Sequence, residues 1–195
     1  KPFFPIGIFG VGKHEFNNND LDQAVKGLKD AGFNLLHSYT DGRNAEFLSA
    51  ARKYGMYVWT DAKHCFWGDK WLVETGRHDP CILSWYIGDD TSYKTWPWEL
   101  LDRYESARMQ DGSRLISQAD WNDSAKYKSR YRDYVDYSDV YMPEIYPIYG
   151  RSEAEDKACV AVTVRDMETA LADIAACPVR RPHGIWPILQ IFHGG

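Results

Sequence analysis

The sequence has no long hydrophobic run, no block of one charge and no low-complexity tract. Its apolar runs have the length of strands and are interrupted by Gly, Pro or Asp, whereas a membrane span requires about 20 mainly apolar residues. The net charge is −5, and Lys and Arg are scattered among the acids, so the chain offers no basic footprint for a nucleic-acid backbone. We therefore expect neither a membrane nor a nucleic acid as a partner.

Cysteine is scarce, and the four cysteines lack CxxC spacing. This disfavours a zinc knuckle and a thioredoxin-type redox pair. Cys65 and Cys81 form a disulfide if the chain is exported, and buried free thiols are the alternative. The chain begins at Lys1 without a signal peptide, which is typical of a mature or trimmed product. The compartment stays unknown, and a secreted or periplasmic location is compatible with these features.

Length and composition predict one domain over residues 1–195, since 44% of the residues are hydrophobic and no linker interrupts them. Aromatic residues are plentiful, with eight Trp and thirteen Tyr. We expect most of these rings in the core. The rest suit a sugar-binding cleft, because flat rings with a polar edge stack against sugars.

Strand-like and helix-like segments alternate along the chain. Residues 20–31 carry apolar side chains at helical spacing, with Asn19 or Asp20 to cap the start and Gly32 to close the end. The other expected helices are 44–54, 98–109, 124–137 and 153–176. The expected strands are 4–9, 33–38, 56–61, 81–87, 114–118, 139–145 and 186–192. Seven apolar strands that alternate with helices predict a parallel sheet covered by helices.

The fold class expected from this alternation is α/β, a (β/α) TIM-type barrel. No GxGxxG follows the first strand and no Walker motif is present, so a nucleotide-binding doubly wound sheet is the weaker alternative and no cofactor is expected. A closed barrel needs about 250 residues, so we expect an incomplete barrel of about seven parallel strands with outer helices. Its open edge requires a covering segment or a second copy, which predicts a homodimer through that edge.

Polar and aromatic residues recur where the expected strands end. In barrels the active site lies at the C-terminal ends of the strands, although polar residues also occur there because strands meet loops. Their hydrogen-bonding groups and ring faces suit a carbohydrate substrate. The expected substrate-binding residues are His37, Tyr39, Asp61, Gln118, Trp121, Tyr146, Gln190 and His193. The segment 96–98, Trp-Pro-Trp, lines a further sugar subsite or else caps the helix that follows it.

Two motifs resemble a known family. Residues 85–90 read Trp-Tyr-Ile-Gly-Asp-Asp, and residues 139–147, after an Asp-Gly-Ser-Arg turn at 111–114, read Asp-Val-Tyr-Met-Pro-Glu-Ile-Tyr-Pro. They resemble TIM-barrel glycoside hydrolases related to clan A, in which the fourth strand typically reads Trp-Tyr-x-x-Asp-Glu-Pro and the sixth ends in an acidic residue before Tyr-Pro. The resemblance implies that Asp90 stands where the acid/base Glu is expected, next to Asp89, and that Thr91 replaces the Pro.

The family's nucleophile, a Glu after strand seven, is replaced here by Gln190 and the segment leading to His193. Glycoside hydrolysis generally needs two carboxyls, so Glu144 is the available partner for Asp90. We hypothesise that Asp90 is the general acid, with Asp89 as its neighbour, and that Glu144 is the base or nucleophile. A separation near 5 Å would indicate retention, and one of about 6.5–9.5 Å inversion.

Two other functions stay open. A degenerate barrel that binds carbohydrate without catalysis is compatible with the missing strand-seven acid. A metal-dependent TIM-barrel hydrolase is the second alternative, with His37, Asp61, His64, Asp90, Glu144 and His193 as ligands. The first strand carries Phe-Gly-Val-Gly where a His-x-His pair would stand, so we expect no metal and favour a glycoside hydrolase acting in polysaccharide or oligosaccharide degradation.

Overall fold

The computed structural model describes residues 3–11, 20–39, 45–62, 73–121, 131–145 and 184–189, and short helical pieces between 161 and 176. The chain divides into two compact units. Unit 1 comprises residues 1–87 and 107–115, and unit 2 comprises residues 88–106 and 116–195. The predicted single domain over 1–195 stays a prediction.

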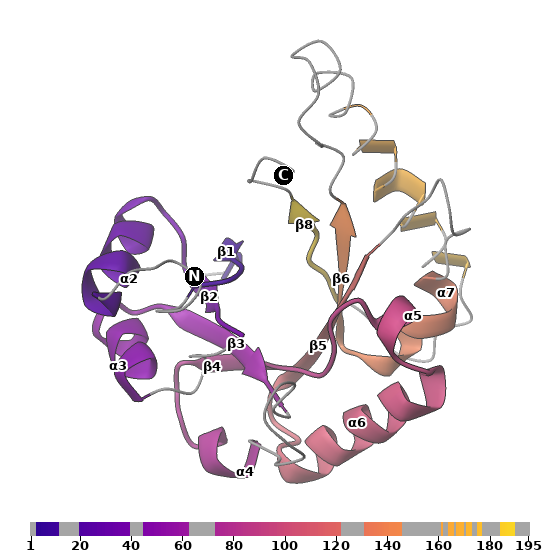
Figure 1. Cartoon of the computed structure of the whole chain (residues 1–195), viewed down its shortest axis with the longest axis horizontal. Coiled ribbons are helices and arrows are strands. Elements are labelled where there is room, and N and C mark those ends of the chain that lie inside the picture. Colours follow the sequence, from indigo (N-terminus) through magenta and orange to yellow (C-terminus); the bar gives the residue numbers. More distant parts are fainter. Residues whose placement is uncertain are drawn as a thin grey trace. The chain divides into compact units, whose positions relative to one another are not determined.

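Unit 1 contains four parallel strands and the helices that follow them (Figure 1). The strands pair in chain order and in parallel. They are β1 (Gly7–Ile8), β2 (Leu35–His37), β3 (Tyr57–Asp61) and β4 (Ile82–Tyr86). The helices are α2 (Leu21–Asp30), α3 (Ala45–Lys53) and α4 (Val73–Gly76). Apart from α4, each of these elements was expected from the sequence within a few residues.

The ends of α2 follow the predicted capping signals. The Asp20 side chain accepts a hydrogen bond from the Gln23 backbone N–H at 3.0 Å, which satisfies one of the N–H groups that a helix start leaves open. Gly32, just after the helix, has a φ of +96°, a conformation that glycine adopts without strain. The expectation for the bounds of this helix is confirmed.

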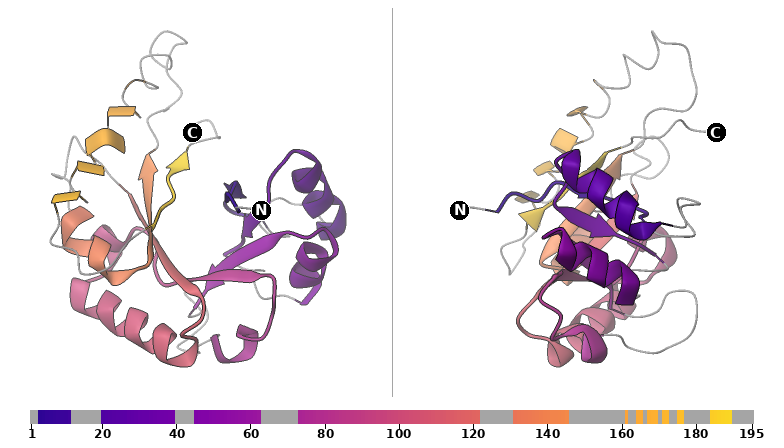
Figure 2. Two further views of the ribbon diagram at one scale, coloured as in Figure 1. Left: turned by 180° about the vertical axis from the view of Figure 1, so that it is seen from behind. Right: turned by 90° about the vertical axis from the view of Figure 1, so that its left-hand side faces the viewer.

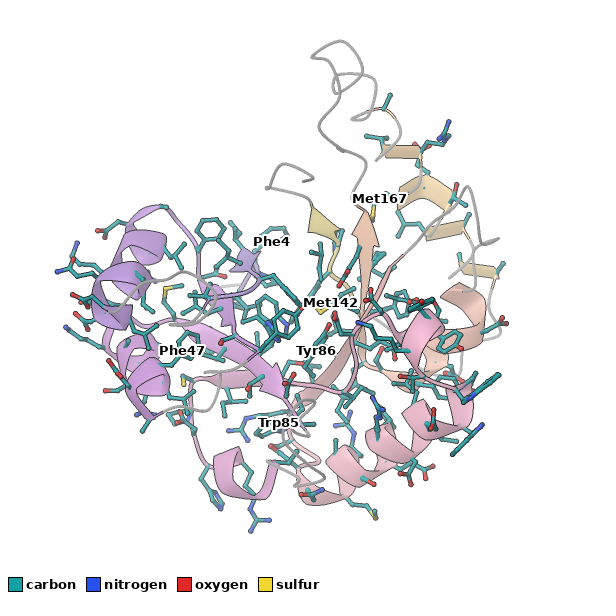
Figure 3. All side chains as sticks on the ribbon, viewed as in Figure 1. Phe4, Phe47, Trp85, Tyr86, Met142 and Met167 are labelled. Carbon is teal, nitrogen blue, oxygen red and sulfur yellow. The ribbon has the colours of Figure 1, made fainter. Side chains whose placement is uncertain are left out.

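Helices α2 and α3 lie side by side on one side of β2 and β3 (Figure 2). Lys53 of α3 forms an ion pair with Asp22 of α2 at 2.8 Å, and the Tyr54 hydroxyl donates to the same carboxylate. Beneath these surface contacts, Phe47 of α3 is fully buried against the strands (Figure 3). Burial of such apolar side chains supplies most of the stabilisation of this layer.

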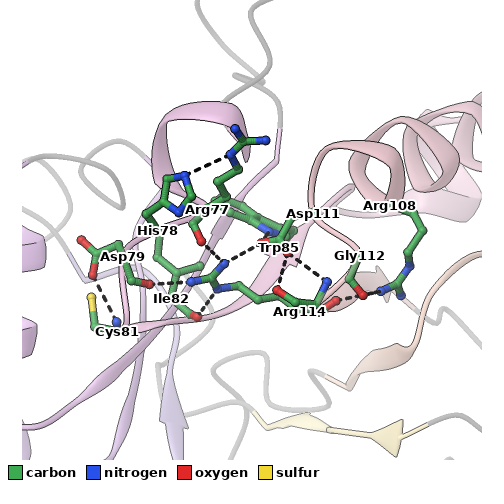
Figure 4. A network of polar contacts seen from close by, with 11 residues as sticks. Arg77, His78, Asp79, Cys81, Ile82, Trp85, Arg108, Asp111, Gly112 and Arg114 are labelled. Carbon is green, nitrogen blue, oxygen red and sulfur yellow. Dashed lines mark hydrogen bonds and ion pairs between the residues drawn. The ribbon is translucent and has the colours of Figure 1, made fainter.

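A polar network around Arg114, a residue between α6 and β5, holds the start of β4 and the residues before it (Figure 4). The Arg114 guanidinium donates to the backbone oxygens of Ile82 and Asp79 at 2.8 Å each, and also to that of Arg77. It forms an ion pair with the buried Asp111 at 2.6 Å. Burial acts to raise the pKa of Asp111, but hydrogen bonds from Ser113, Trp85 and Arg114 outweigh it and hold that pKa well below its usual range.

Unit 2 contains the later strands and helices. The strands β5 (Leu115–Trp121), β6 (Val140–Ile145), β7 (Gly184–Ile185) and β8 (Ile188–Leu189) are parallel, and β6 pairs with each of the other three. The helical elements are α5 (Thr91–Lys94), α6 (Pro97–Gln110), α7 (Tyr131–Tyr134) and the 3₁₀ turn η1 (Val135–Tyr137). Both α6 and β5 continue into unit 1 at one end.

The expected seventh strand, 186–192, is wrong in its bounds. Its described part, residues 186–189, contains only the short strand β8, while β7 lies before it and Trp186 and Pro187 separate the two. Proline has no N–H to donate to a strand ladder, so the pairing is interrupted there. The short helices α4 and α5 were not expected, because four residues are too few to show a helical period.

Strand order decides the fold class. From β1 to β7 the strands are neighbours in chain order, and β8 pairs with β6. A doubly wound sheet would reverse its order at a switch point, so this sheet has the consecutive order of a (β/α) barrel that is incomplete. The predicted fold class is confirmed, while the homodimer through an open edge stays a prediction. In the described part of the chain, no helix is long and apolar enough to cross a membrane.

The Arg114 network makes the first prediction. Arg114→Ala leaves three backbone oxygens and the buried Asp111 without their main donor, so we expect the free energy of unfolding to fall by about 2–4 kcal/mol. Lys26→Ala removes an exposed ion pair with Asp30 and should leave the free energy of unfolding nearly unchanged. Urea denaturation measures both, and an Arg114→Ala protein as stable as the Lys26→Ala control would contradict the role of the network.

Candidate functional site

The residues that follow β4 bring two carboxylates to the start of α5 in unit 2. Asp90 has φ +48° and ψ +46°, and it is the one non-glycine residue with positive φ in the described ranges. The left-handed conformation costs an L-residue about 1–2 kcal/mol, although Asp tolerates it better than most. Asp90 stands at the N-cap of α5, yet its side chain makes no capping hydrogen bond. The backbone oxygen of Asp90 accepts the first hydrogen bonds of the helix, from the N–H groups of Tyr93 and Lys94, while its side chain takes no part in the cap.

The Asp90 carboxylate forms an ion pair with Lys94 instead. The Lys94 Nζ lies 2.6 Å from Asp90 Oδ2 and 3.6 Å from Asp89 Oδ2. Partial burial acts to lower the pKa of Lys94, but the ion pairs with Asp90 and Asp89 outweigh it and raise that pKa above its usual value. One ammonium group thus bridges the two acids of the Asp-Asp motif.

Asp120, near the end of β5, supplies the cap that Asp90 does not. Its Oδ1 accepts hydrogen bonds from the Ser92 backbone N–H at 2.9 Å and from the Ser92 hydroxyl at 2.6 Å. Its Oδ2 accepts one from the Tyr141 hydroxyl at 2.7 Å. Gly88 allows this close approach, because a Cβ there would lie 2.6 Å from the Thr91 methyl group. The buried carboxylate therefore ties α5 to β5 and β6.

Burial raises the pKa of Asp120, and the negative charge of Asp90 acts in the same direction, against the hydrogen bonds from Ser92 and Tyr141. A carboxyl whose pKa is higher in the folded than in the unfolded chain contributes stability that is present at low pH. That contribution is lost as the pH rises through the raised pKa. The three hydrogen bonds from Ser92 and Tyr141 therefore stabilise the ionised form of Asp120, whereas burial destabilises it.

The strand register separates Asp120 from Glu144. Asp120 is paired with Pro143, and Trp121 with Glu144, so the side chains of Asp120 and Glu144 point to opposite faces of the sheet. The face of Gln118, Asp120 and Tyr141 meets α5 and α7, because Gln118 Nε2 donates to the Tyr134 oxygen at 2.9 Å. Glu144 is 5% exposed and lies on the other face, the one that lines the interior of a barrel.

In unit 1, polar and aromatic side chains also lie on the face of the strands that points away from the helices. His37, Trp59 and Asp61 alternate with the helix-facing residues, and Tyr86 is in register with Asp61. Four rings surround the His37 imidazole, which is stacked on Phe9 at 4.2 Å between centroids. Neither ring nitrogen of His37 has a hydrogen-bond partner among the described residues. Burial lowers the pKa of His37 to about 3, so the ring is neutral at physiological pH.

The predicted substrate-binding residues are distributed over both units. In unit 1, His37 and Asp61 are buried, and Tyr39 is half-buried with its ring against Phe9 and His37. In unit 2, Gln118 is fully buried on the helix side of the sheet, and Trp121 closes β5. Tyr146, Gln190 and His193 lie outside the described residues. Their assignment to substrate binding stays a prediction for all eight.

Sequence reasoning gave no role to Lys94, Ser92 and Asp120. The spacing from Asp90 to Lys94, i to i+4, would have indicated an ion pair if the short helix α5 had been recognised. The hydrogen bond from Ser92 to Asp120 joins residues 28 apart and leaves no local signal in the sequence.

The predictions on the cysteines and on a metal site are tested only for the residues that the structure describes. Cys81 is a buried free thiol, and Cys65 lies outside the described residues. Within the described ranges, no three His, Cys, Asp or Glu side chains are grouped so that they could hold a metal ion. His64 and His193, which the metal-dependent alternative requires, are not among those residues.

Comparison with known proteins finds relatives by structure alone. No family model matches the sequence, and no curated protein matches it. A GH2 β-galacturonidase from Eisenbergiella tayi bound to glycerol has 18% identity and a TM-score of 0.59 over 84% of this chain and 30% of its own. The β-glucuronidase of Parabacteroides merdae has 14% identity and a TM-score of 0.55 over 86% of this chain and 21% of its own.

A third similar structure is β-glucuronidase 3 of Bacteroides uniformis, with 18% identity and a TM-score of 0.55 over 85% of this chain and 21% of its own. The chain thus spans less than a third of the length of these structures. At such identities the likeness shows a shared fold: this chain has the fold of a region of glycoside hydrolases.

The buried His37 predicts a pH dependence of stability. The unfolded chain binds a proton at His37 below about pH 6.5, whereas the folded chain does so only near pH 3, so stability falls as the pH is lowered across this window. We expect a slope of up to about 1.4 kcal/mol per pH unit from this group. His37→Phe should reduce the slope by that amount in urea titrations between pH 4 and 7, while exposed His78→Gln leaves it unchanged. Equal slopes in all three proteins would refute this account.

Asp120 makes a separate prediction. Asp120→Ala leaves two Ser92 donors and the Tyr141 hydroxyl without an acceptor, so we expect the free energy of unfolding to fall by about 2–4 kcal/mol. Asp120→Asn keeps a carbonyl oxygen and should lose less. The free energy of unfolding of Asp120→Asn, relative to that of the parent, should also increase as the pH rises above about 4, because the amide has no charge to bury. Exposed Asp102→Ala is the control, and a similar loss in it and in Asp120→Ala would contradict the capping role.

Proposed function

We propose that this chain is the barrel portion of a glycoside hydrolase and that it cleaves a glycosidic bond with Asp90 and Glu144 as its carboxyl pair, Asp89 standing beside Asp90. The observation that carries the proposal is the strained Asp90, which gives up the cap of α5 and faces Lys94. The consecutive parallel strands and the shared fold with glycoside hydrolases support it. Carbohydrate is the proposed partner.

The two carboxyls have different surroundings, and hydrolysis needs one charged and one protonated group. Sequence alone assigned the acid role to Asp90. The Lys94 Nζ lies 2.6 Å from Asp90 Oδ2, and this ion pair holds the carboxylate in position, which suits a base or nucleophile. Glu144 is buried near the end of β6, and in a two-carboxyl mechanism the general-acid role falls to it. We therefore propose the reverse division, with Asp90 as base or nucleophile and Glu144 as acid.

In this mechanism Glu144 would protonate the leaving oxygen of the glycosidic bond. Asp90 would attack the anomeric carbon or activate the water that does so. Lys94 would hold the Asp90 carboxylate in position before the sugar binds, and Asp89 would be the second partner of Lys94. The residues 37, 39, 61, 118, 121, 146, 190 and 193 stay the proposed contacts to substrate.

Paired variants test the function and the division of roles. Asp90→Asn and Glu144→Gln should each lower hydrolysis of the cleaved glycan by at least about a hundredfold on a panel of β-glucans, xylans, mannans and galactans. Exposed Asp102→Asn and Glu105→Gln are matched controls that should keep the parent rate. Turnover by Asp90→Asn and Glu144→Gln at the parent rate would refute the assignment of the pair.

The roles separate with activated substrates. A dinitrophenyl glycoside has a leaving group that needs no proton, so Glu144→Gln should retain most of its activity on it while Asp90→Asn does not. The opposite result would restore the acid role to Asp90. Binding of glycans by the parent without any turnover would favour a carbohydrate-binding protein instead.

A further inference from the structure

A groove in unit 2 borders the carboxylate cluster. It has a volume of about 190 Å³ and is lined by Ser92, Tyr93, Lys94, Thr95, Trp96 and Tyr134. Ser92 and Lys94 belong to the cluster as well, since one holds Asp120 and the other holds Asp90. The groove is therefore continuous, through these two side chains, with the proposed site of hydrolysis.

Hydrogen bonds fix the backbone of the residues that line the groove. Helix α5 lies beside α7 (Figure 1), and the Tyr134 hydroxyl of α7 donates to the Thr95 backbone oxygen at 3.1 Å. The Trp96 backbone N–H donates to Glu99 Oε2 at 2.8 Å, which fixes the start of α6. The segment 96–98 thus forms the capped start of α6, one of the two predictions made for it, and Trp96 is among the residues that line the groove.

Two large rings on the groove are exposed. Tyr93 is 73% and Trp96 is 64% exposed, although Trp has much to gain from burial. Exposed flat rings beside hydroxyl groups suit the ring of a sugar, whose C–H face stacks on an aromatic ring while its edge makes hydrogen bonds. Trp98, in the same segment, is 67% exposed but does not line the groove.

Charge favours a neutral sugar. The carboxylates next to the groove are those of Asp89 and Asp90, which pair with Lys94, and that of Asp120, which holds Ser92. Lys94 is the cation that lines the groove, and its charge is already engaged by Asp90 and Asp89. The carboxylate of a uronic acid placed there would meet like charges and compete for Lys94, which costs binding energy.

We propose that this groove is a subsite for one sugar unit of a neutral oligosaccharide, stacked on Trp96 and Tyr93 and adjoining Asp90 through Lys94. The proposal rests on the proposed function for its place beside the cleaved bond. It adds the class of substrate, a neutral glycan rather than a uronic-acid polymer.

Isothermal titration calorimetry tests the subsite on the whole chain. The probes are the hexasaccharides of β-glucan, xylan, mannan and β-galactan, and an oligogalacturonate of equal length. We expect the parent to bind at least one neutral probe and to bind the oligogalacturonate at least about tenfold more weakly. Trp96→Ala and Tyr93→Ala should each weaken the neutral probe about 3- to 10-fold. The control Trp98→Ala should bind like the parent, and the thermal unfolding midpoints of all variants should match.

Several results would overturn the subsite. They are no binding of any neutral probe by the parent, unchanged affinity in both Trp96→Ala and Tyr93→Ala, an equal loss in Trp98→Ala, and equal affinity for the oligogalacturonate. Failure of the proposed function has a different signature. In that case the binding pattern appears as expected, but the parent releases no product from the bound probe.

Discussion

The candidate site of unit 2 depends on the buried carboxylate of Asp120. By accepting the N–H and the hydroxyl of Ser92, Asp120 caps α5 from a neighbouring strand. Asp90 at the helix start has a left-handed backbone and no side-chain cap, and its carboxylate pairs with Lys94. The same residues, Ser92 and Lys94, form part of the groove. One charged group on β5 therefore positions the catalytic candidate, its cation and the proposed sugar subsite together.

The alternation of side chains along the strands divides the polar strand-end residues into two sets. Gln118 and Asp120 face the helices and hold them, the first through Tyr134 and the second through Ser92. Glu144 in unit 2, and His37 and Asp61 in unit 1, face the other side of their strands. Burying polar groups on the helix side costs free energy unless they are hydrogen-bonded, so their partners are structural requirements. In a barrel, chemistry is expected at the C-terminal ends of the strands, and Glu144 lies near that end of β6.

Much of the fold was predictable because its signals are local. The cap at Asp20, the glycine at position 32 and the apolar period between them define α2 within one residue. The strand at 186–192 was misjudged because Pro187 splits its pairing. Of the candidate site, the acids at positions 89, 90 and 144 could be named from the sequence, since strand-end position and residue type are visible in it, and their roles stay predictions. Which face Gln118 occupies depends on strand register, and the link from Ser92 to Asp120 spans 28 residues, so neither has a local signature.

The central claim is that the chain hydrolyses a glycosidic bond at the anomeric carbon, and the fate of solvent oxygen tests it most directly. The parent protein is incubated with a neutral oligosaccharide in water labelled with oxygen-18, and the products are analysed at once by mass spectrometry. The account predicts that each cleavage places one labelled oxygen on the anomeric carbon of the new reducing end, and that Glu144→Gln loses this product. Oligosaccharide that remains intact, or products without the label, would contradict it.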